Sequence, residues 1–218
     1  MIFPTLKGQQ GGYVNFDLLA KAWLEKHPDA PRSPNPFLDV VAHAELVYDF
    51  HKEAGLVFSY GGWLEERSTI LAGTYLEKEK IFMHLGVDLN PPEGTLIAVD
   101  DDAQVILVDD DHPWEGGWGP HVMVKLAHAP VYLLYAHLSR DIRVKVGDAI
   151  ENGTIIGSVG PSTENGGWFP HLHLQALSEE GYAQFKKDPD HLDGYGHVND
   201  RAQLAKLYPD PLPYIRLA

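Results

Sequence analysis

Histidine and aspartate residues occur at spacings suited to a metal site in two separate parts of the sequence. The first part holds His84 and Asp88, four positions apart, and the second holds His171 and His173, two positions apart. In a strand, positions two or four apart point to the same face, so the members of each pair can converge, while Leu172 and Leu174 beside His173 face the core. Two imidazole nitrogens and one carboxylate oxygen, with a fourth position left open, form the arrangement of catalytic zinc.

Each of these motifs is weak by itself, because a single strand histidine is more often a surface residue or a hydrogen-bonded core residue than a ligand. Their joint occurrence, with the run YAHL at 135–138 between them, is much more specific. The chain has 12 histidines and no cysteine. A transition-metal site must therefore use imidazole and carboxylate ligands, and no disulfide can form.

The elements that must position these side chains change in type along the chain. Apolar residues at helical spacing predict helices over 15–27, with Asn15 as N-cap, and over 35–54, where Asn35 and Pro36 give a cap followed by proline. From about residue 56 the pattern changes to short strands separated by glycine- and proline-rich turns. The predicted strands are Leu56–Tyr60, Ile70–Tyr75, Leu85–Leu89, Thr95–Val99, Ala103–Val108, Val122–Ala127, Val131–Ala136, Thr154–Val159 and His171–Leu177.

Many closely spaced strands without alternating helices favour an antiparallel sheet assembly. We therefore expect an α+β fold that is mostly β. It would have a β-sandwich-like catalytic core with a groove, N-terminal helices and an irregular, proline-containing tail after Ser178. The expected divisions are an N-terminal extension of residues 1–75, a core of residues 76–180 and a C-terminal tail of residues 181–218. The extension and the tail are expected to narrow the ends of the groove and so influence specificity.

The formal net charge of -14 limits the classes of partner. A nucleic-acid backbone or an anionic membrane surface calls for a basic footprint, which this composition opposes. The first residues lack the basic start and apolar run of a signal peptide, and no stretch approaches the roughly 20 apolar residues of a membrane span. The expectation is a cytoplasmic protein that binds neither nucleic acid nor membrane. The sequence leaves the oligomeric state open.

Four blocks of the sequence resemble the lysostaphin-type zinc endopeptidases, in the order that this family has them. The run MHLGVDLNPPEGTLIAVD looks like the first block, and VYLLYAHLS is similar to the middle block. The run VKVGDAIENGTIIGSVGPS resembles the paired glycine turns, and PHLHLQ resembles the closing HxH strand. The resemblance covers roughly residues 80–177 and implies the duplicated hybrid motif fold of peptidoglycan endopeptidases.

The resemblance also implies a role for each of five residues. One zinc ion would be held by His84, Asp88 and His173. His171 would be the general base for the attacking water, and His137 would stabilise the tetrahedral intermediate. The implied substrate is a peptide or a peptidoglycan fragment, whose amide bond would be hydrolysed by metal-activated water. The acidic charge and the lack of a recognisable wall-binding module leave the wall itself open as the target.

Two other functions stay open beside zinc endopeptidase activity. One is a non-catalytic or regulatory metal-binding member of the same fold, although such relatives usually lose metal ligands that this chain keeps. The other is a zinc carboxypeptidase, although such relatives generally have a longer gap between the first histidine and the aspartate.

Several further residues are candidates for local roles. Trp118 and Trp168 lie in glycine-flanked loops, where they could wall a substrate groove or simply pack beneath a loop. Arg67 is a candidate to pair with a carboxylate near the site. By spacing, His191 and His197 could bind a second metal, but a solvated tail is the favoured interpretation. Exposed or local hydrogen-bonding roles are expected for His112, His121 and His128.

Overall fold

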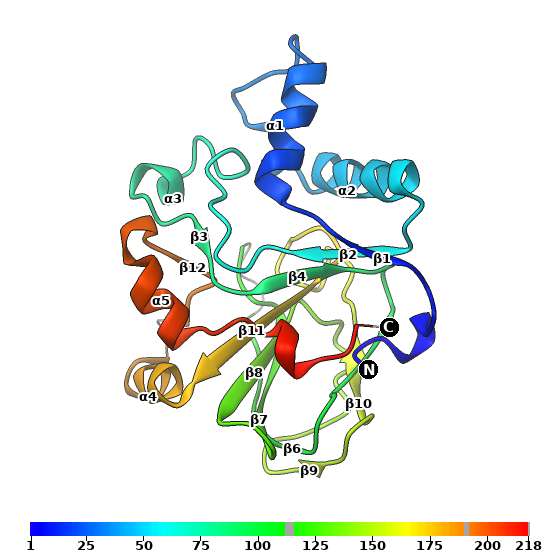
Figure 1. Ribbon diagram of the computed structural model, residues 1–218, viewed down its shortest axis with the longest axis vertical. Coiled ribbons are helices and arrows are strands. Elements are labelled where there is room, and N and C mark those ends of the chain that lie inside the picture. Colours follow the sequence, from blue (N-terminus) through cyan, green and yellow to red (C-terminus); the bar gives the residue numbers. More distant parts are fainter. Residues whose placement is uncertain (112–115, 190–191, 218) are drawn as a thin grey trace.

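A large sheet organises the computed structural model, which describes residues 1–111, 116–189 and 192–217 (Figure 1). The order of its strands is β1-β2-β4-β11-β8-β7-β6-β9, and two further two-stranded sheets pair β10 with β5 and β12 with β3. Neighbours in the large sheet are antiparallel, except for the parallel pair of β1 and β2. The strands are β1 (Gly11–Tyr13), β2 (Phe58–Gly61), β3 (Met83–His84), β4 (Val87–Asn90), β5 (Leu96–Ala98), β6 (Ala103–Asp110), β7 (Pro120–Leu126), β8 (Val131–Ala136), β9 (Ala149–Ile150), β10 (Ile155–Ser158), β11 (Leu172–Ser178) and β12 (Tyr195–Gly196).

Alternation along the strands divides the large sheet into two faces. In β8, Val131, Leu133 and Tyr135 enter the main core, which also holds residues of the small sheet of β5 and β10. The intervening residues Tyr132 and Leu134 pack on the opposite face, against side chains of the C-terminal segment. The predicted sandwich-like, mostly β fold is therefore confirmed. The face opposite the main core is the one that carries His173 of β11.

Helices frame this sheet at two places. They are α1 (Phe16–Lys26), α2 (Val40–Ala54), α3 (Tyr75–Lys78), α4 (Glu179–Lys187) and α5 (Arg201–Leu207). In Figure 1, α1 and α2 lie above the β1–β2 end of the sheet, whereas α4 and α5 lie beside β11. Asn15 caps α1 as predicted, by accepting a hydrogen bond from the amide of Leu18. The second helix begins later than predicted, because Asn35 caps a short 3-10 turn and Asp39 caps α2 itself.

Three predictions about elements are wrong. Residues 70–75 form turns that lead into α3, since the side chain of Thr74 caps that helix instead of continuing a strand. The predicted strand Leu85–Leu89 is broken at residues 85–86, which separate β3 from β4. The tail after Ser178 is not irregular, because Ser178 caps α4 and a second helix, α5, follows. The prolines that suggested irregularity lie outside both helices.

The N-terminal segment is part of the core as well as an extension of it. Ile2, Phe3 and Phe58 are buried in the same cluster as the strands of the large sheet. The amide of Ile2 donates to the carbonyl oxygen of Arg216 at 2.8 Å, and both ends of the chain lie close together in Figure 1. The division at residues 75 and 180 stays a prediction.

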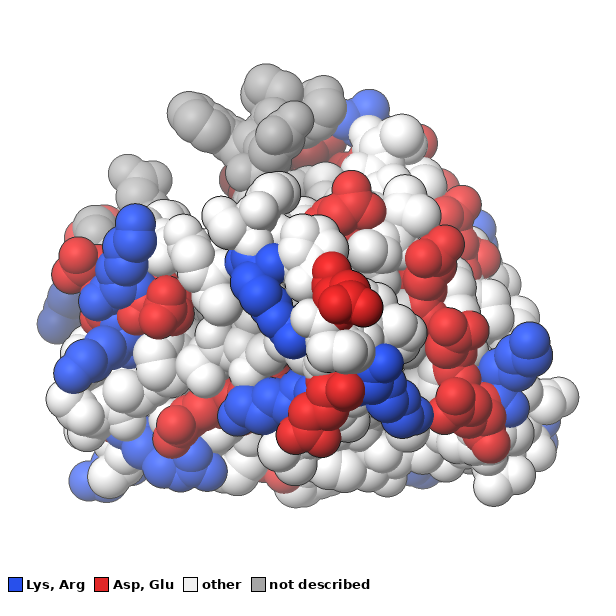
Figure 2. Space-filling view, turned by 90° about the horizontal axis from the view of Figure 1, so that it is seen from above, with Lys and Arg blue, Asp and Glu red and all other residues white. Residues whose placement is uncertain are grey.

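The surface seen in Figure 2 is mixed in charge, with Lys and Arg separated from one another by acidic and uncharged side chains. Within the described ranges, every helix is too short or too polar to cross a membrane.

Candidate active site

The register of two neighbouring strands brings Asp88 and His173 together. Asp88 in β4 lies directly opposite His173 in β11, so their side chains leave the same face of the sheet a short distance apart. His84 comes from β3 and reaches the same point by way of the break at residues 85–86. The sequence predicted this convergence, although it placed His84 and Asp88 in one continuous strand.

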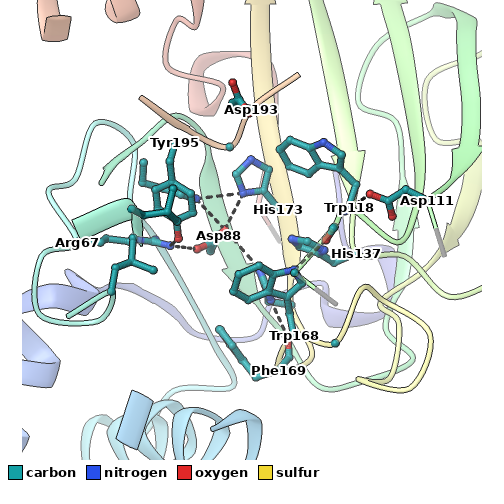
Figure 3. A pocket seen from close by; sticks show the side chains of 18 of the residues that line it. Arg67, Asp88, Asp111, Trp118, His137, Trp168, Phe169, His173, Asp193 and Tyr195 are labelled. Carbon is teal, nitrogen blue, oxygen red and sulfur yellow. Dashed lines mark hydrogen bonds and ion pairs between the residues drawn. The ribbon is translucent and has the colours of Figure 1, made fainter. Parts of the chain in front are cut away.

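Three atoms with free lone pairs, which can accept hydrogen bonds or bind a metal ion, meet at this point. Nδ1 of His84 lies 2.9 Å from the carbonyl oxygen of Gly62, and Nε2 of His173 lies 3.0 Å from Oε1 of Gln175. Because only a protonated nitrogen can bond to these oxygens, the other nitrogen of each neutral ring carries a lone pair. Those nitrogens, Nε2 of His84 and Nδ1 of His173, both face Oδ1 of Asp88. Figure 3 shows His173 directed toward Asp88.

The distances among these acceptors fit a shared cation. Nε2 of His84 lies 3.1 Å from Nδ1 of His173, and Oδ1 of Asp88 lies 3.4 Å from the former and 3.1 Å from the latter. Acceptors at this separation repel one another unless a positive charge lies between them. Ligands bound at about 2.0–2.1 Å in a tetrahedral arrangement lie about 3.3 Å apart. Among the described residues, His84, Asp88 and His173 are the group of histidine, cysteine and acidic residues that could hold a metal ion.

The protonation states of the cluster suit this interpretation. Burial alone would raise the pKa of Asp88, but the Arg67 guanidinium and the facing imidazoles outweigh it and hold that pKa well below its ordinary value. Burial, together with the charge of Arg67, lowers the pKa of His84 to about 4. At neutral pH Asp88 is therefore an ionised carboxylate and His84 a neutral imidazole, the forms that metal ligation requires.

Two more imidazoles lie beside the cluster. Nε2 of His171 lies 3.6 Å from Oδ1 of Asp88, and its Nδ1 lies 2.7 Å from the carbonyl oxygen of Phe169. His137 has its ring centroid 4.6 Å from that of His171, and its Nδ1 lies 2.9 Å from the carbonyl oxygen of Asn165. In both rings the backbone oxygen fixes the proton on Nδ1, which leaves Nε2 as an acceptor.

Burial keeps these two rings neutral. It lowers the pKa of His171, and Asp88 opposes that shift only in part. It lowers the pKa of His137 well below the ordinary value, and the nearby His171 and His173 lower it further. Neutral imidazoles with a free Nε2 can accept a proton at neutral pH.

The backbone of His137 is unusual. Its φ of 64° lies in the left-handed region, which costs an L-residue with a Cβ free energy. His137 follows directly after β8 and donates its amide to the carbonyl oxygen of Trp118 at 2.9 Å. Such conformations persist where surrounding contacts enforce them, and they concentrate at functional sites.

A cleft of about 1310 Å³ contains all five of these residues. Trp118 and Trp168 are half-buried and both line it, on the two sides of His137 in Figure 3. The Nε1 atom of Trp118 donates to the carbonyl oxygen of Leu192 at 2.9 Å, and that of Trp168 to Gly117 at 2.8 Å. The two indoles are therefore fixed by the loops around them and present their rings to the cleft.

Two residues of the site, Tyr195 outside the four motif blocks and Gln175 at the end of PHLHLQ, were not predicted from the sequence. Tyr195 in β12 lies over His84, with 5.3 Å between ring centroids, and its hydroxyl lies 3.4 Å from Nη1 of Arg67. Nothing in the sequence indicated that the C-terminal segment would pair with β3. Gln175 could have been found, since it continues the alternation of His171 and His173 on one strand face.

The remaining histidines have local roles where the structure describes them. His121 is buried with Nδ1 2.7 Å from the carbonyl oxygen of Gly119, and His128 is exposed and pairs with Asp101 at 2.5 Å. The side chain of His197 caps a 3-10 helix. His112 and His191 lie outside the described residues, so the suggestion of a second metal at His191 and His197 stays untested.

The sequence matches a known family. The profile of peptidase family M23 matches residues 82–185. The catalytic domain of a variant of the prophage-encoded M23 protein EnpA from Enterococcus faecalis is 32% identical, over 44% of this chain and 69% of that one, with a TM-score of 0.38. No curated protein matches the chain significantly.

Two other solved structures show the range of the similarity. The catalytic domain of lysostaphin from Staphylococcus simulans is 23% identical, over 61% of this chain and 79% of that one, with a TM-score of 0.42. A zinc-containing peptidase from Vibrio cholerae is 28% identical, over 44% of this chain and 28% of that one, with a TM-score of 0.38.

Because these TM-scores are low, the family assignment rests on the sequence matches. The residues matched by the family profile include the three acceptors of the cluster and both of the imidazoles beside it. The EnpA domain adds identity above 30% across more than two thirds of its length. The chain belongs to peptidase family M23, the family of the lysostaphin-type peptidases.

Proposed function

We propose that this chain is a zinc-dependent endopeptidase that hydrolyses an amide bond in peptidoglycan or in peptides derived from it. The observation that carries the proposal is the convergence of three unprotonated acceptors, from His84, Asp88 and His173, on one point of the cleft. A single ion bound there would have two neutral nitrogen ligands and one carboxylate, with an open position toward the cleft.

When bound, zinc would supply a Lewis acid for the scissile carbonyl and lower the pKa of water at the site. The chain itself would move the proton. Nε2 of His171 is unprotonated and faces the cluster, so it would accept a proton from the attacking water. The carbonyl oxygen of Phe169 would stabilise the resulting imidazolium through the Nδ1 proton.

His137 would act on the other side of the scissile bond. Since its Nδ1 is held by Asn165, its Nε2 can donate to a tetrahedral oxyanion only after it gains a proton. The proton taken from water could reach it, because its ring lies beside that of His171, and would then pass to the leaving amine as the C–N bond breaks. A donor aimed at the developing charge stabilises the transition state. Trp118 and Trp168 would wall the groove in which the peptide lies.

Family membership supports the proposed substrate class. M23 peptidases are represented among the similar proteins by lysostaphin, described as an antimicrobial peptidase, which suggests bacterial wall peptides as the substrate. The chain keeps all five residues that the family resemblance implies for the site, His84, Asp88, His137, His171 and His173. Their presence favours catalysis over a regulatory role. No observation favours the carboxypeptidase alternative.

Metal analysis and peptide digestion test the proposal. We expect about one zinc per chain, and hydrolysis of glycine-rich or D-amino-acid peptides that stops with a chelator and returns with zinc. His171→Ala should keep its zinc and lose about 10²–10⁴-fold in kcat, whereas His173→Ala should lose the zinc itself.

The two variants serve as controls for each other, since each removes one imidazole, from His173 in β11 or from His171 directly before it. Equal zinc content in both variants would contradict the assignment of His173 as the ligand and His171 as the base. A zinc-loaded protein that cleaves no peptide from peptidoglycan would contradict the proposed substrate class. Cleavage only of peptides with a free terminus would contradict endopeptidase activity.

A further inference from the structure

Arg67 lies outside the part of the chain matched by the family profile, yet it contacts the metal cluster directly. Its amide donates to the carbonyl oxygen of Phe82 at 2.9 Å, and Glu66 forms an antiparallel bridge with Met83. The segment that carries Arg67 therefore runs beside β3, and Glu65 and Arg67 point to the same side of it. Both side chains are almost fully buried.

The guanidinium binds one particular oxygen of Asp88. Nη1 of Arg67 lies 2.7 Å from Oδ2 of Asp88, whereas Oδ1 is the oxygen that faces His84 and His173. In Figure 3, Arg67 and His173 approach the carboxylate from opposite sides. The pairing with Arg67 thus fixes the rotation of the carboxylate and leaves one oxygen for an ion.

A second set of contacts fixes Arg67 itself. Its Nε lies 3.2 Å from Oε1 of Glu65, and both carboxylate oxygens of Glu65 accept the amide of Phe16 at 3.2 Å. The ring of Phe16, the first residue of α1, lies 5.2 Å from the guanidinium carbon. Nη1 also approaches the hydroxyl of Tyr195 at 3.4 Å. The start of α1 is therefore connected to the metal cluster through two buried, charged side chains.

We propose that Arg67 is a positioning residue that holds Asp88 for one-oxygen metal binding and couples this geometry, through Glu65, to the start of α1. The inference rests on the metal site of the proposed function. This role requires the several N–H groups of a guanidinium, because Nε of Arg67 binds Glu65 while Nη1 binds Asp88. A lysine has one charged nitrogen and cannot hold both carboxylates in this way.

The direction of the change in metal affinity, when Arg67 is replaced, distinguishes a positioning role from a purely electrostatic one. Removing a buried positive charge beside a cation would by itself tighten the binding of that cation. Lost positioning has the opposite effect, because outer contacts of metal ligands typically contribute 10–100-fold to metal affinity. Weaker binding in a neutral variant therefore indicates positioning, and tighter binding indicates charge alone.

The experiment compares metal binding in Arg67→Met, Arg67→Lys and the unsubstituted protein. Affinities for Zn²⁺ are measured by competition with a chromophoric chelator, and the visible absorption of bound Co²⁺ reports the number of ligands. We expect about 10–100-fold weaker Zn²⁺ binding in Arg67→Met. We also expect weaker Co²⁺ absorption, because a second oxygen of Asp88 raises the coordination number. Arg67→Lys should fall between Arg67→Met and the unsubstituted protein.

Arg143→Met is the matched control, since Arg143 is exposed and pairs with Asp141 at 2.9 Å on the surface. It should bind Zn²⁺ as the unsubstituted protein does. Circular dichroism establishes that each variant is folded before metal is added. If Arg67→Met does not fold, the comparison of Arg67→Lys with the unsubstituted protein tests the proposal.

Unchanged or tighter Zn²⁺ binding in Arg67→Met would overturn the proposal. So would an Arg67→Lys variant with the affinity and Co²⁺ spectrum of the unsubstituted protein. These outcomes leave the proposed function intact. Failure of the unsubstituted protein to bind metal would instead contradict the proposed function itself.

Discussion

At the scale of single residues, the chemistry of the site depends on which atom of each side chain is already bonded. Each of the four imidazoles of the site donates one N–H to an oxygen of the protein and leaves its other nitrogen free to act in the cleft. Asp88 divides its oxygens in the same way, with one directed to Arg67 and one to the histidines. The surrounding oxygens and the guanidinium thus set the tautomers and the carboxylate orientation before any ligand binds.

His137 gives a prediction at this scale, because one residue combines a proposed catalytic ring with a left-handed backbone. His137→Ala and His137→Gly both remove the imidazole, so each should lose about 10²–10⁴-fold in kcat while it keeps its metal. Glycine tolerates the left-handed conformation, so His137→Gly should be about 1 kcal/mol more stable than His137→Ala. Peptide digestion, metal analysis and urea unfolding measure the three quantities.

The two variants of His137 control for each other. If activity recovered in the glycine variant alone, backbone strain and not the lost imidazole would explain the defect in the alanine variant. Loss of metal in both variants would contradict a role for His137 outside the ligand set.

At the scale of elements, the site depends on how closely β4 approaches β11. Gly86 lies in the break between β3 and β4, where a Cβ would come 2.6 Å from Nε2 of His173 and 2.7 Å from the carbonyl oxygen of Leu174. Displacing a backbone oxygen of a central strand costs free energy, because the strand is held on both sides. A side chain at this position would therefore push His173 and β11 away from Asp88.

Gly86→Ala is accordingly expected to weaken Zn²⁺ binding and to destabilise the fold by about 1–3 kcal/mol, the usual cost of overpacking. Chelator competition and urea unfolding measure the two effects. Gly157→Ala in β10 is the control, because the nearest atom to its added Cβ lies at an ordinary 3.6 Å. That variant should change stability by no more than about 0.5 kcal/mol. Equal effects of the two substitutions would contradict the steric argument.

At the scale of the whole molecule, the N- and C-terminal segments are joined at one carboxylate. Asp100 is almost fully buried as a side chain. It accepts hydrogen bonds from the ammonium group of Met1 at 2.6 Å and from the backbone amide and the guanidinium of Arg216. Burial raises the pKa of Asp100, but the hydrogen bonds from Arg216 and from the Met1 ammonium group outweigh it and lower the pKa below its ordinary value of 3.8.

A lowered pKa makes this contact a source of pH-dependent stability. Because the folded chain binds the proton less tightly than the unfolded chain, Asp100 stabilises the fold above pH 3.8, and the contribution is lost as the pH falls below that value. Asp100→Asn should therefore be less stable by about 1–2 kcal/mol at neutral pH. The difference from the unsubstituted protein should shrink in acid, as followed by urea unfolding across the range.

Asp29→Asn is the control for net charge, since Asp29 is exposed and carries the same formal charge. It should unfold like the unsubstituted protein at every pH tested. A deficit of Asp100→Asn that stays constant from neutral pH into acid would show that ionisation of Asp100 contributes nothing.

The sequence by itself determined the parts of this protein that depend on local order. The alternation of His171 and His173 with leucines fixed which face of β11 carries imidazoles, because strand side chains alternate regardless of their partners. Asn15 likewise identified the start of α1, since capping involves only residues within one turn. The four motif blocks indicated the family and the mostly β fold.

Only the tertiary structure decided the contacts that join distant segments. The strand predicted for residues 70–75 was wrong because local β-propensity there yields to turns and a capped helix. The approach of Tyr195 to His84, and of Arg67 to Asp88, depends on pairings that span much of the chain. Spacing in the sequence carries no information about such pairings, because they are selected by the burial of the whole sheet and its covering segments. The ligand types were therefore readable from the sequence, whereas their orientation was decided by the folded chain.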